Sequence, residues 1–487
     1  MIITAMANWR PAPGEMLEWH PVTAARDDAD GTGDAGVHPV PASFLQANHV
    51  RGVDAALRRG DRHTGFLGSA TEIEGDLDDA ALTRAVAVFL SRHEGLRTWF
   101  SVRDGSVRRH PAPADAALVP VDAGAASSTD GVREAVRDRL SRDATPLSWP
   151  PVAIGAVRRP GSFSLYYGAD HAFSDGASQV SVITELADLY RAEVTGTPAL
   201  DLTEHEGSFL DHVRIEDEVS PSYDLRSPEL ADWIDVVSRH DGGLPRFPLD
   251  LGLAPGETAP MEPVERDLLT AAEAEVFEQV CRDAGGSFTS GLFAACALVE
   301  HDLAGTGRYD GIAVLSTRHR GPFALSQGWF CAFSPVTFPV SDSNGPDDFA
   351  EVVRSATAAY ARAKAAASVP IGRVLDLLAT GGIGGAGLAR SPQLFSYLDF
   401  RRFPGSGTPA DERAVLFTGE GRTANASMWF NRDHRHLYLG AQIPSTPTAR
   451  RTVRRYHDRL IELLTDVVRT RDDGRATGVI GADERCA

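Results

Sequence analysis

The chain has 487 residues, of which 43% are hydrophobic and 24% are charged, as in ordinary soluble globular proteins. Its formal net charge of -19 argues against nucleic acid as the main partner. No apolar run approaches the roughly 18–20 residues of a membrane span, and the first residues lack the basic region of a signal peptide. We therefore expect a cytoplasmic protein. The four cysteines show no metal-ligand spacing and fit a reducing compartment.

Helices and strands are predicted in mixed order over the first half of the chain. Residues 26–40 are polar and glycine-rich, which predicts a surface loop. Residues 76–93 predict a helix, because apolar residues recur on one face and three aspartates suit its positive N-terminal end. Two strands and another helix are predicted, at 96–102, 152–157 and 130–142.

The segment 170–176, Asp-His-Ala-Phe-Ser-Asp-Gly, is the strongest candidate site. It follows an alternating apolar stretch at 163–167, which predicts a half-buried strand, and precedes apolar residues at helical spacing in 178–190. A histidine between a strand and a helix, here His171, can meet a substrate while both elements hold it still, which suits a general base. A lone histidine is more often a packing or capping residue, so these residues alone leave both interpretations open.

The second half also mixes helices and strands. Glycine and proline cluster without periodicity in residues 241–262, which predicts an interdomain linker. Further helices and a strand are predicted, at 270–283, 289–303, 346–366 and 448–469 and at 311–316. A glycine-rich loop at 381–387 has the composition of a phosphate loop but lacks the following Lys-Ser/Thr. The last residues predict a loose tail. Mixed elements in both halves favour α/β or α+β lobes.

Four segments, in order along the chain, resemble one superfamily. Residues 92–100, Arg-His-Glu-Gly-Leu-Arg-Thr-Trp-Phe, resemble the "RHExLRTxF" signature of nonribosomal peptide condensation domains. Residues 170–176 resemble the HHxxxDG motif of that family. Arg318 followed by Gly-Trp-Phe at 328–330 resembles its "GR…IGFFVN" segment, and residues 391–400 fit its order of elements.

A subgroup is also indicated. Residues 19–21, 45–51 and 397–402 look like stand-alone polyketide-associated (PapA-type) acyltransferases. The resemblance implies an α/β (α+β) fold of two chloramphenicol-acetyltransferase-like lobes in a V-shaped pseudo-dimer, with the active site in the tunnel between them. The N-terminal lobe would span 1–240 and the C-terminal lobe 263–487, joined by the linker at 241–262.

The resemblance also implies a reaction. An acyl group would pass from a phosphopantetheine thioester, on an acyl or peptidyl carrier protein or on CoA, to a small-molecule hydroxyl, giving an ester in natural-product or lipid biosynthesis. No cofactor, nucleic acid or membrane span is expected, and the chain is expected to be a monomer.

An amine acceptor, giving an amide, is the close variant of this reaction. The alternative from a different functional class is a catalytically inactive binding module, which would bind a carrier protein and recruit another enzyme. A trimeric chloramphenicol-type enzyme is disfavoured because this chain is long enough for two lobes.

The family's functional residues carry over position by position. His171 matches the catalytic histidine, and its near-neutral pKa suits a general base. Asp175 matches an aspartate that pairs with an arginine from the second lobe, which would be Arg318. Gly176 keeps the backbone open, and its amide is a candidate oxyanion donor. Asp170 departs from the pattern, because the family usually has a first histidine there. It could orient a neighbouring group or accept a backbone hydrogen bond in the strand-to-loop turn, and it keeps the recruitment alternative open.

Other candidates have ordinary explanations. His93 belongs to the first signature and is expected to support the core of its lobe. His434 and His436 are expected in a polar hairpin turn without a metal. Trp329 and Trp429 are expected to pack, with tunnel lining as the alternative. A basic stripe near the C-terminus is expected to be a solvated face, with an acidic carrier protein or a nucleotide phosphate as the possible ligand; it consists of Arg450, Arg451, Arg454 and Arg455.

Overall fold

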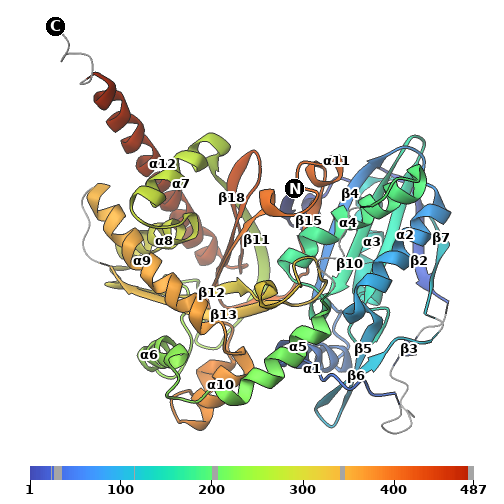
Figure 1. Cartoon of the computed structure of the whole chain (residues 1–487), viewed down its shortest axis with the longest axis horizontal. Coiled ribbons are helices and arrows are strands. Elements are labelled where there is room, and N and C mark those ends of the chain that lie inside the picture. Colours follow the sequence, from blue (N-terminus) through green and yellow to red (C-terminus); the bar gives the residue numbers. More distant parts are fainter. Residues whose placement is uncertain (23–24, 27–35, 115, 200–206, 341–345, 481–487) are drawn as a thin grey trace. The chain divides into compact units, whose positions relative to one another are not determined.

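The computed structural model describes residues 1–22, 25–26, 36–114, 116–199, 207–340 and 346–480. These fold into two compact units whose segments alternate along the chain (Figure 1). Unit 1 consists of Met1–Ser220, Ser316–Cys331 and Phe400–Gly421, and unit 2 of Pro221–Leu315, Ala332–Asp399 and Arg422–Ala487. Most of the predicted loop at 26–40 and the end of the predicted tail lie outside the described residues.

Unit 1 is built on a seven-stranded sheet with the order β1-β15-β4-β10-β9-β2-β7. The strands are β1 (Ile2–Thr4), β2 (Gly14–Pro21), β4 (Phe66–Glu74), β7 (Leu118–Ala126), β9 (Val152–Arg159), β10 (Ser162–Asp170) and β15 (Val415–Thr418). Its helices are α1 (Phe44–Arg58), α2 (Asp79–Arg92), α3 (Thr129–Asp143), α4 (Gly176–Thr195), α5 (Phe209–Val219) and α11 (Pro409–Glu412). Two small sheets complete it, β3 (Ala25–Arg26) with β8 (Ser148–Trp149) and β5 (Thr98–Arg103) with β6 (Ser106–Pro111).

Helices cover both faces of the sheet around β10. Phe163 and Tyr167 contact aromatic side chains of α4 and α2, with ring centroids 5.2 Å from Tyr190 and 5.8 Å from Phe89. Tyr166 points to the opposite face, into the cluster formed with α3. Every residue of β10 after Ser162 is therefore buried. The prediction of a half-buried strand was wrong because alternation of side chains does not reveal a helix layer on the second face.

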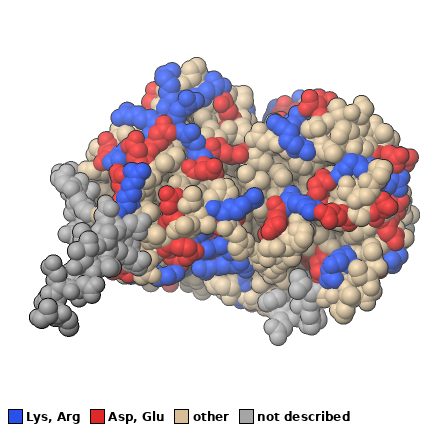
Figure 2. Space-filling model, turned by 90° about the horizontal axis from the view of Figure 1, so that it is seen from above, with Lys and Arg blue, Asp and Glu red and all other residues tan. Residues whose placement is uncertain are grey.

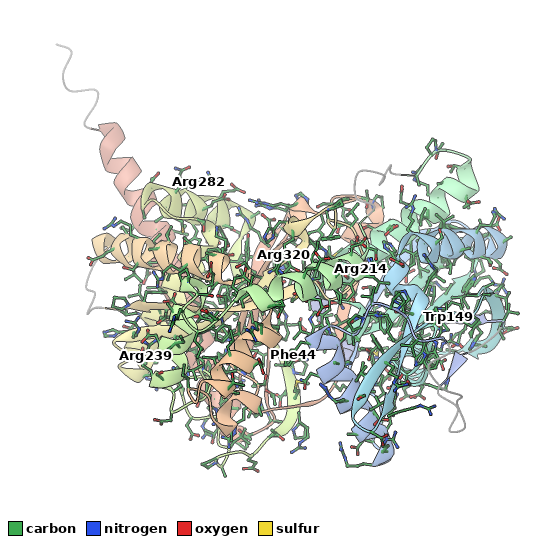
Figure 3. All side chains as sticks on the ribbon, turned by 60° about the horizontal axis from the view of Figure 1, so that its bottom comes forward. Phe44, Trp149, Arg214, Arg239, Arg282 and Arg320 are labelled. Atoms are coloured by element: carbon green, nitrogen blue, oxygen red, sulfur yellow. The ribbon has the colours of Figure 1, made fainter. Side chains whose placement is uncertain are left out.

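Helix starts in unit 1 follow the capping residues. Asp78 caps α2, accepting a hydrogen bond from Ala81 N at 2.8 Å, and Asp175 caps α4. Two side chains labelled in Figure 3 contrast the core with the surface. Trp149 is buried and its Nε1 donates to Leu96 O at 3.1 Å, whereas Phe44 is 41% exposed. Acidic and basic side chains are intermixed over the face of the molecule in Figure 2.

Unit 2 has a second seven-stranded sheet, in the order β13-β12-β14-β17-β18-β11-β16. Its strands are β11 (Ala259–Thr270), β12 (Arg308–Ser316), β13 (Cys331–Pro339), β14 (Leu394–Asp399), β16 (Arg422–Thr423), β17 (Ser427–Arg432) and β18 (His436–Pro444). Its helices are α6 (Ala231–Arg239), α7 (Ala271–Asp283), α8 (Phe288–Ala304), α9 (Pro346–Ala366), α10 (Ile371–Thr380) and α12 (Pro447–Ile480). The two mixed α/β units confirm the predicted fold class.

Two local predictions in unit 2 need correction. The last residues of the predicted linker begin strand β11. Helix α12 extends past residue 469 to Ile480, and so includes part of the predicted loose tail. The glycine-rich loop follows helix α10 instead of a strand, so it does not have the setting of a phosphate loop. Its glycines serve backbone packing: Gly385 N donates to Gly242 O at 2.8 Å, and a Cβ on Gly387 would lie 2.7 Å from Gly243 Cα.

No helix in the described part of the chain combines the length and hydropathy that crossing a membrane requires. The predicted lobe boundaries and the V with its tunnel stay predictions.

Candidate active site

His171 lies at the carboxyl end of a central strand of unit 1. Strand β10 pairs with β4 on one side and β9 on the other, so its end is fixed by two ladders. A 3-10 turn, His171–Phe173, follows at once. The turn is held from outside, because His171 N donates to Gly65 O at 2.9 Å and Gln46 Nε2 donates to Ala172 O at 2.7 Å. The imidazole is therefore presented by a rigid connection, as its position in the sequence predicted.

The hydrogen bonds of His171 set its tautomer. Its Nδ1 lies 2.9 Å from Ser174 O. A carbonyl oxygen only accepts, so Nδ1 carries the proton and the neutral ring offers the lone pair of Nε2. Nε2 has no hydrogen-bond partner among the residues that the structure describes. Burial, followed by the positive charge of His49, lowers the pKa of His171, which favours the neutral ring.

Trp329 packs against this imidazole. The two ring centroids lie 4.1 Å apart with an interplanar angle of 32°. His49, from α1, completes a group of three rings, with centroids 6.1 Å from His171 and 5.9 Å from Trp329. We call these three side chains the ring cluster. Trp329 was expected to pack, and the structure gives its packing partners as two histidines.

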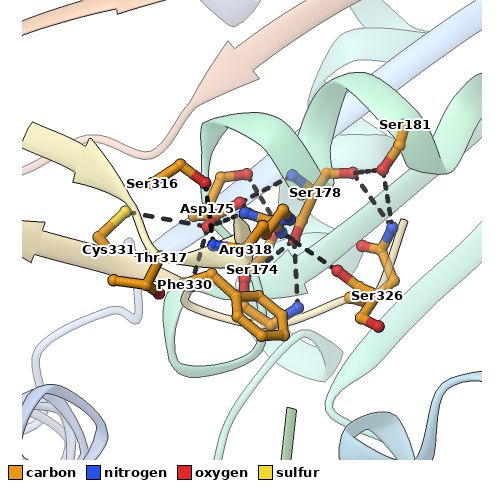
Figure 4. A network of polar contacts seen from close by, with 12 residues as sticks. Ser174, Asp175, Ser178, Ser181, Ser316, Thr317, Arg318, Ser326, Phe330 and Cys331 are labelled. Carbon is orange, nitrogen blue, oxygen red and sulfur yellow. Dashed lines mark hydrogen bonds and ion pairs between the residues drawn. The ribbon is translucent and has the colours of Figure 1, made fainter. Parts of the chain in front are cut away.

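The predicted pair of Asp175 and Arg318 is present in unit 1 (Figure 4). Arg318 Nη1 lies 2.7 Å from Asp175 Oδ2, and Nη2 lies 3.0 Å from Oδ1, so the contact is bidentate. Both side chains are buried, and the guanidinium lies 4.5 Å from the centroid of the Phe330 ring. Arg318 comes from the second half of the sequence, as expected, but its segment, Ser316–Cys331, belongs to the same compact unit as Asp175.

Further hydrogen bonds tie Asp175 and α4 to the segment Ser316–Cys331. Asp175 accepts from Ser178 N at 2.7 Å and from Phe330 N at 2.9 Å. Ser178 Oγ donates to Gly328 O at 2.9 Å and accepts from Arg318 Nη2 at 2.7 Å. Burial alone would raise the pKa of Asp175, but the charge of Arg318 and these donors hold it below its usual range. The carboxylate is thus an ionised anchor for the loop that carries His171.

Gly176 is the first residue of α4. The amide of Ser178 is used by Asp175 Oδ1, and that of Gln179 by Asp175 O at 2.8 Å. The Gly176 amide has no hydrogen-bond partner among the described residues. It stands at the positive end of a 20-residue helix, close in sequence to His171.

Asp170, the departure from the family motif, is buried and ionised. Its Oδ1 accepts from Ala172 N at 2.8 Å and caps the 3-10 turn. Its Oδ2 lies 3.0 Å from His49 Nε2 and 3.2 Å from His63 Nε2. Burial would raise the pKa of Asp170, but the charges of the two histidines and the hydrogen bond from His49 outweigh it and hold the pKa well below its usual range.

Residues 60–382 match the model of the condensation domain family. The chain belongs to this family. Among curated proteins, this condensation-domain chain is 31% identical over 420 residues to 2'-acyl-2-O-sulfo-trehalose (hydroxy)phthioceranyltransferase PapA1 of Mycobacterium tuberculosis, covering 86% of this chain and 78% of that protein. It is 27% identical over 484 residues to trehalose-2-sulfate acyltransferase PapA2 of the same species, covering 98% of both.

Comparison with solved structures gives the same fold. The condensation-domain chain superposes on PapA2 acyl transferase with a TM-score of 0.83 at 25% identity, over 96% of this chain and 100% of that one. The first condensation domain of the CDA synthetase shares the fold, with a TM-score of 0.65 at 20% identity over 88% and 96% of the two chains. The predicted PapA-type family is confirmed, and the protein is an acyltransferase.

The weaker candidates of the condensation-domain chain have structural partners. His93 Nε2 lies 2.9 Å from Glu185 Oε2, and its ring packs on Phe89. His436 Nδ1 lies 2.8 Å from Asp433 Oδ1 at the turn between β17 and β18. Among the described residues, no group of three or more His, Cys, Asp or Glu side chains could hold a metal ion.

The stripe of arginines lies on α12 in unit 2. Arg450 Nη2 lies 2.6 Å from Glu262 Oε2, and Arg459, one turn beyond the stripe, lies 2.6 Å from Asp302. Acidic neighbours therefore neutralise part of this surface.

Sequence reasoning missed His49 and its contact with Asp170. The two residues are 121 positions apart, and neither periodicity nor spacing pairs them. The only signal was the segment 45–51, which resembles PapA-type enzymes and includes His49.

Proposed function

We propose that the protein transfers an acyl group from a phosphopantetheine thioester, on CoA or a carrier protein, to a sugar hydroxyl in lipid biosynthesis. The observation that carries the proposal is the His171 ring: Nδ1 is bonded to a carbonyl, Nε2 is left as a base, and the ring is packed on Trp329. The names of PapA1 and PapA2 describe acyl transfer to trehalose-based acceptors, which supports a sugar hydroxyl.

In the proposed reaction, His171 Nε2 takes the proton of the acceptor hydroxyl as its oxygen attacks the thioester carbon. The C–O bond forms and the carbonyl electrons move to oxygen, giving a tetrahedral oxyanion. When this collapses, the C–S bond breaks, and the leaving thiolate receives the proton from the His171 imidazolium. The products are an ester, a free thiol and the original neutral histidine, so the cycle needs no cofactor.

The oxyanion needs donors, and the Gly176 amide is the proposed one. It has no partner among the residues that the structure describes and lies at the N-terminal end of α4, where the helix dipole favours negative charge. Asp175 and Arg318 are proposed as positioning residues. Their buried pair fixes the start of α4, and with it both Gly176 and the loop of His171.

The alternatives are weaker. An amine would be activated by the same base, but the names of the relatives favour a hydroxyl. The recruitment alternative rested on Asp170 in place of a histidine and on the acidic surface. Because Asp170 is bonded within the His171 turn and to His49, its presence fits a working site without that alternative.

The test is His171→Gln, assayed with palmitoyl-CoA as donor and trehalose or trehalose 2-sulfate as acceptor. Release of the CoA thiol is followed by absorbance with a disulfide reagent, and the ester by mass spectrometry. Loss of a base typically costs 10²–10⁴-fold, so we expect kcat to fall by roughly that factor.

The matched control is His319→Gln. His319 is exposed and makes the same type of Nδ1 contact to a carbonyl, 3.0 Å from Ser316 O, but is outside the ring cluster. It should keep full activity. Full activity in His171→Gln, with normal folding, would contradict the proposal.

A further inference from the structure

Asp170 carries a buried charge that needs a cation beside it. Its side chain is 0% exposed, and an isolated carboxylate in such a place would be strongly destabilising. Oδ1 is used by the Ala172 amide, which leaves Oδ2 for the two imidazoles. His49 Nε2 meets Oδ2 with hydrogen-bond geometry at 3.0 Å, whereas His63 Nε2, at the longer distance of 3.2 Å, lacks that geometry. His49 is therefore the partner best placed to carry the positive charge.

His49 is also the partner that faces the proposed base. Its side chain remains 18% exposed, against 3% for that of His63. Its ring contacts Asp170 through Nε2 and also lies near the rings of His171 and Trp329, with centroids 6.1 and 5.9 Å away. The positive charge that Asp170 stabilises on His49 therefore lies close to His171, because the centroids of the two imidazole rings are 6.1 Å apart.

We propose that His49, anchored by Asp170, is a positioning residue for acyl transfer: its imidazolium faces His171 and keeps that ring neutral and able to accept a proton. This inference rests on the proposed function of His171. It gives Asp170 a role in place of the motif's first histidine, namely to hold a second imidazole, from α1, beside the base.

Electrostatics supports this assignment. Burial opposes a charge on His49, but the charge and hydrogen bond of Asp170 outweigh it and raise the pKa of His49. Burial and the charge of His49 lower the pKa of His171. When the environments of two neighbouring titratable groups push their pKa values apart, one group stays protonated and the other stays neutral. Here His49 is the protonated group and His171 is the neutral one.

Other charges face His171 as well. Asp170, at the end of β10, and Asp175, before α4, each raise the pKa of His171, and Asp175 is neutralised by Arg318. The segment Ser316–Cys331 presents the uncharged Trp329 to the ring. Within the described part of the chain, His49 is the cation found to lower the pKa of His171, so removing it while leaving Asp170 should give the largest change.

The size of this change follows from Coulomb's law. With ring centroids 6.1 Å apart, effective dielectric constants between 80 and 20 give a shift of about 0.5–2 pH units. In His49→Gln the pKa of His171 should rise by this amount, because Asp170 keeps its charge. In Asp170→Asn both charges vanish, since the amide can donate to a neutral His49. The pKa of His171 should then fall between those of the wild type and His49→Gln.

The first experiment needs no substrate. The full chain labelled with ¹³C at histidine Cε1 is titrated by NMR, and the His49 and His171 signals are assigned by their loss in His49→Gln and His171→Gln. His63→Gln is the matched control, because it removes an imidazole from the same carboxylate but from outside the ring cluster. It should shift the pKa of His171 by less than a third of the His49→Gln shift. An unchanged pKa of His171 in folded His49→Gln would overturn the inference.

The second experiment is the pH profile of kcat/KM with palmitoyl-CoA and trehalose. Because the neutral His171 is the active form, a higher pKa moves the acid limb to higher pH. His49→Gln should show this shift of about 0.5–2 pH units and regain activity at pH 8–9. A structural defect would lower activity at every pH, and that result would also overturn the inference. If His171→Gln retains full activity, the proposed function itself fails, so the two failures are distinct.

Discussion

Removal of the Arg318 side chain tests whether the buried ion pair holds the loop of His171. Arg318→Met keeps an apolar stem against Phe330 but removes both donors to Asp175, at 2.7 and 3.0 Å. The Asp175 carboxylate still accepts hydrogen bonds from the backbone amides of Ser178 and Phe330, so it keeps part of its hydrogen bonding. Breaking a buried pair costs about 3–5 kcal/mol, and with two amides left we expect about 4 kcal/mol in unfolding of unit 1.

The double variant separates the lost pair from the stranded charge. In Asp175→Asn/Arg318→Met the remaining side chain is neutral, and its oxygen can still accept from Ser178 N. It should therefore be more stable than Arg318→Met by about 1–2 kcal/mol, because the desolvation of the unpaired carboxylate is gone.

The sign of the pH dependence follows from Asp175. In the wild type its pKa is lowered, so its stabilisation is present above the unfolded value near 3.8 and is lost as the pH falls through the folded value. Without Arg318, burial raises the pKa, and the variant takes up a proton on folding as the pH falls. The difference between wild type and Arg318→Met should thus be larger at pH 7 than at pH 4.

Hydrogen exchange during urea unfolding is the suitable assay, because a global signal would mix the two compact units. Peptides containing Ser178 and Phe330 report on the amides that Asp175 binds. A cost below about 1 kcal/mol for Arg318→Met, or a double variant less stable than the single one, would refute the reasoning.

Two further changes probe unit 2 and the ring cluster. Glu300 is buried against Tyr456 OH, and burial raises its pKa to about 8, so stability falls as the pH rises from 4.5 toward 8. Glu300→Gln should raise the free energy of unfolding by on the order of 3 kcal/mol at pH 8 and little at pH 5, as measured by thermal unfolding. An equal gain in stability at the two pH values would contradict this prediction. A Cβ on Gly65 would lie 2.7 Å from His49 Cε1, so Gly65→Ala should cost about 1–3 kcal/mol and shift the acid limb of kcat/KM. Gly52→Ala, with open space around it, is the control, and equal effects in both would contradict the role of His49.

Local patterns predicted much of the fold. The aspartates before α2 and α4, and Thr270 with Glu273 before α7, mark helix starts that the structure places within three residues of the predictions. Strand β11 was missed because prolines usually argue against a strand. It tolerates Pro263 because β16 pairs only with Ala259 and Pro260. Among the described strands, the rest of β11 pairs with β18 alone, so its other side is a sheet edge, where a residue without an amide proton is accepted.

Only some of the contacts in the candidate site could be predicted from the sequence. The position of His171 followed from its setting between a strand and a helix, and its partner residues Asp175 and Arg318 from the family resemblance. The contact of Asp170 with His49 could not follow from either, because it depends on how α1 packs beside the end of β10. Likewise, no change in composition marks Ser316–Cys331 as part of unit 1.

The alternation of segments between the units has a consequence for synthesis on the ribosome. Strand β15 pairs with both β1 and β4, yet it ends at Thr418, long after the rest of the sheet has been made. At about 5–20 residues per second, the nascent sheet waits roughly 10–40 s after Ser220 for this strand. During that interval β1 has no neighbour and β4 has an open edge, and Asp175 has no arginine until Arg318 is made about halfway through it. A chain truncated at Ser220 should therefore be prone to aggregate, even though it contains His171 and most of unit 1.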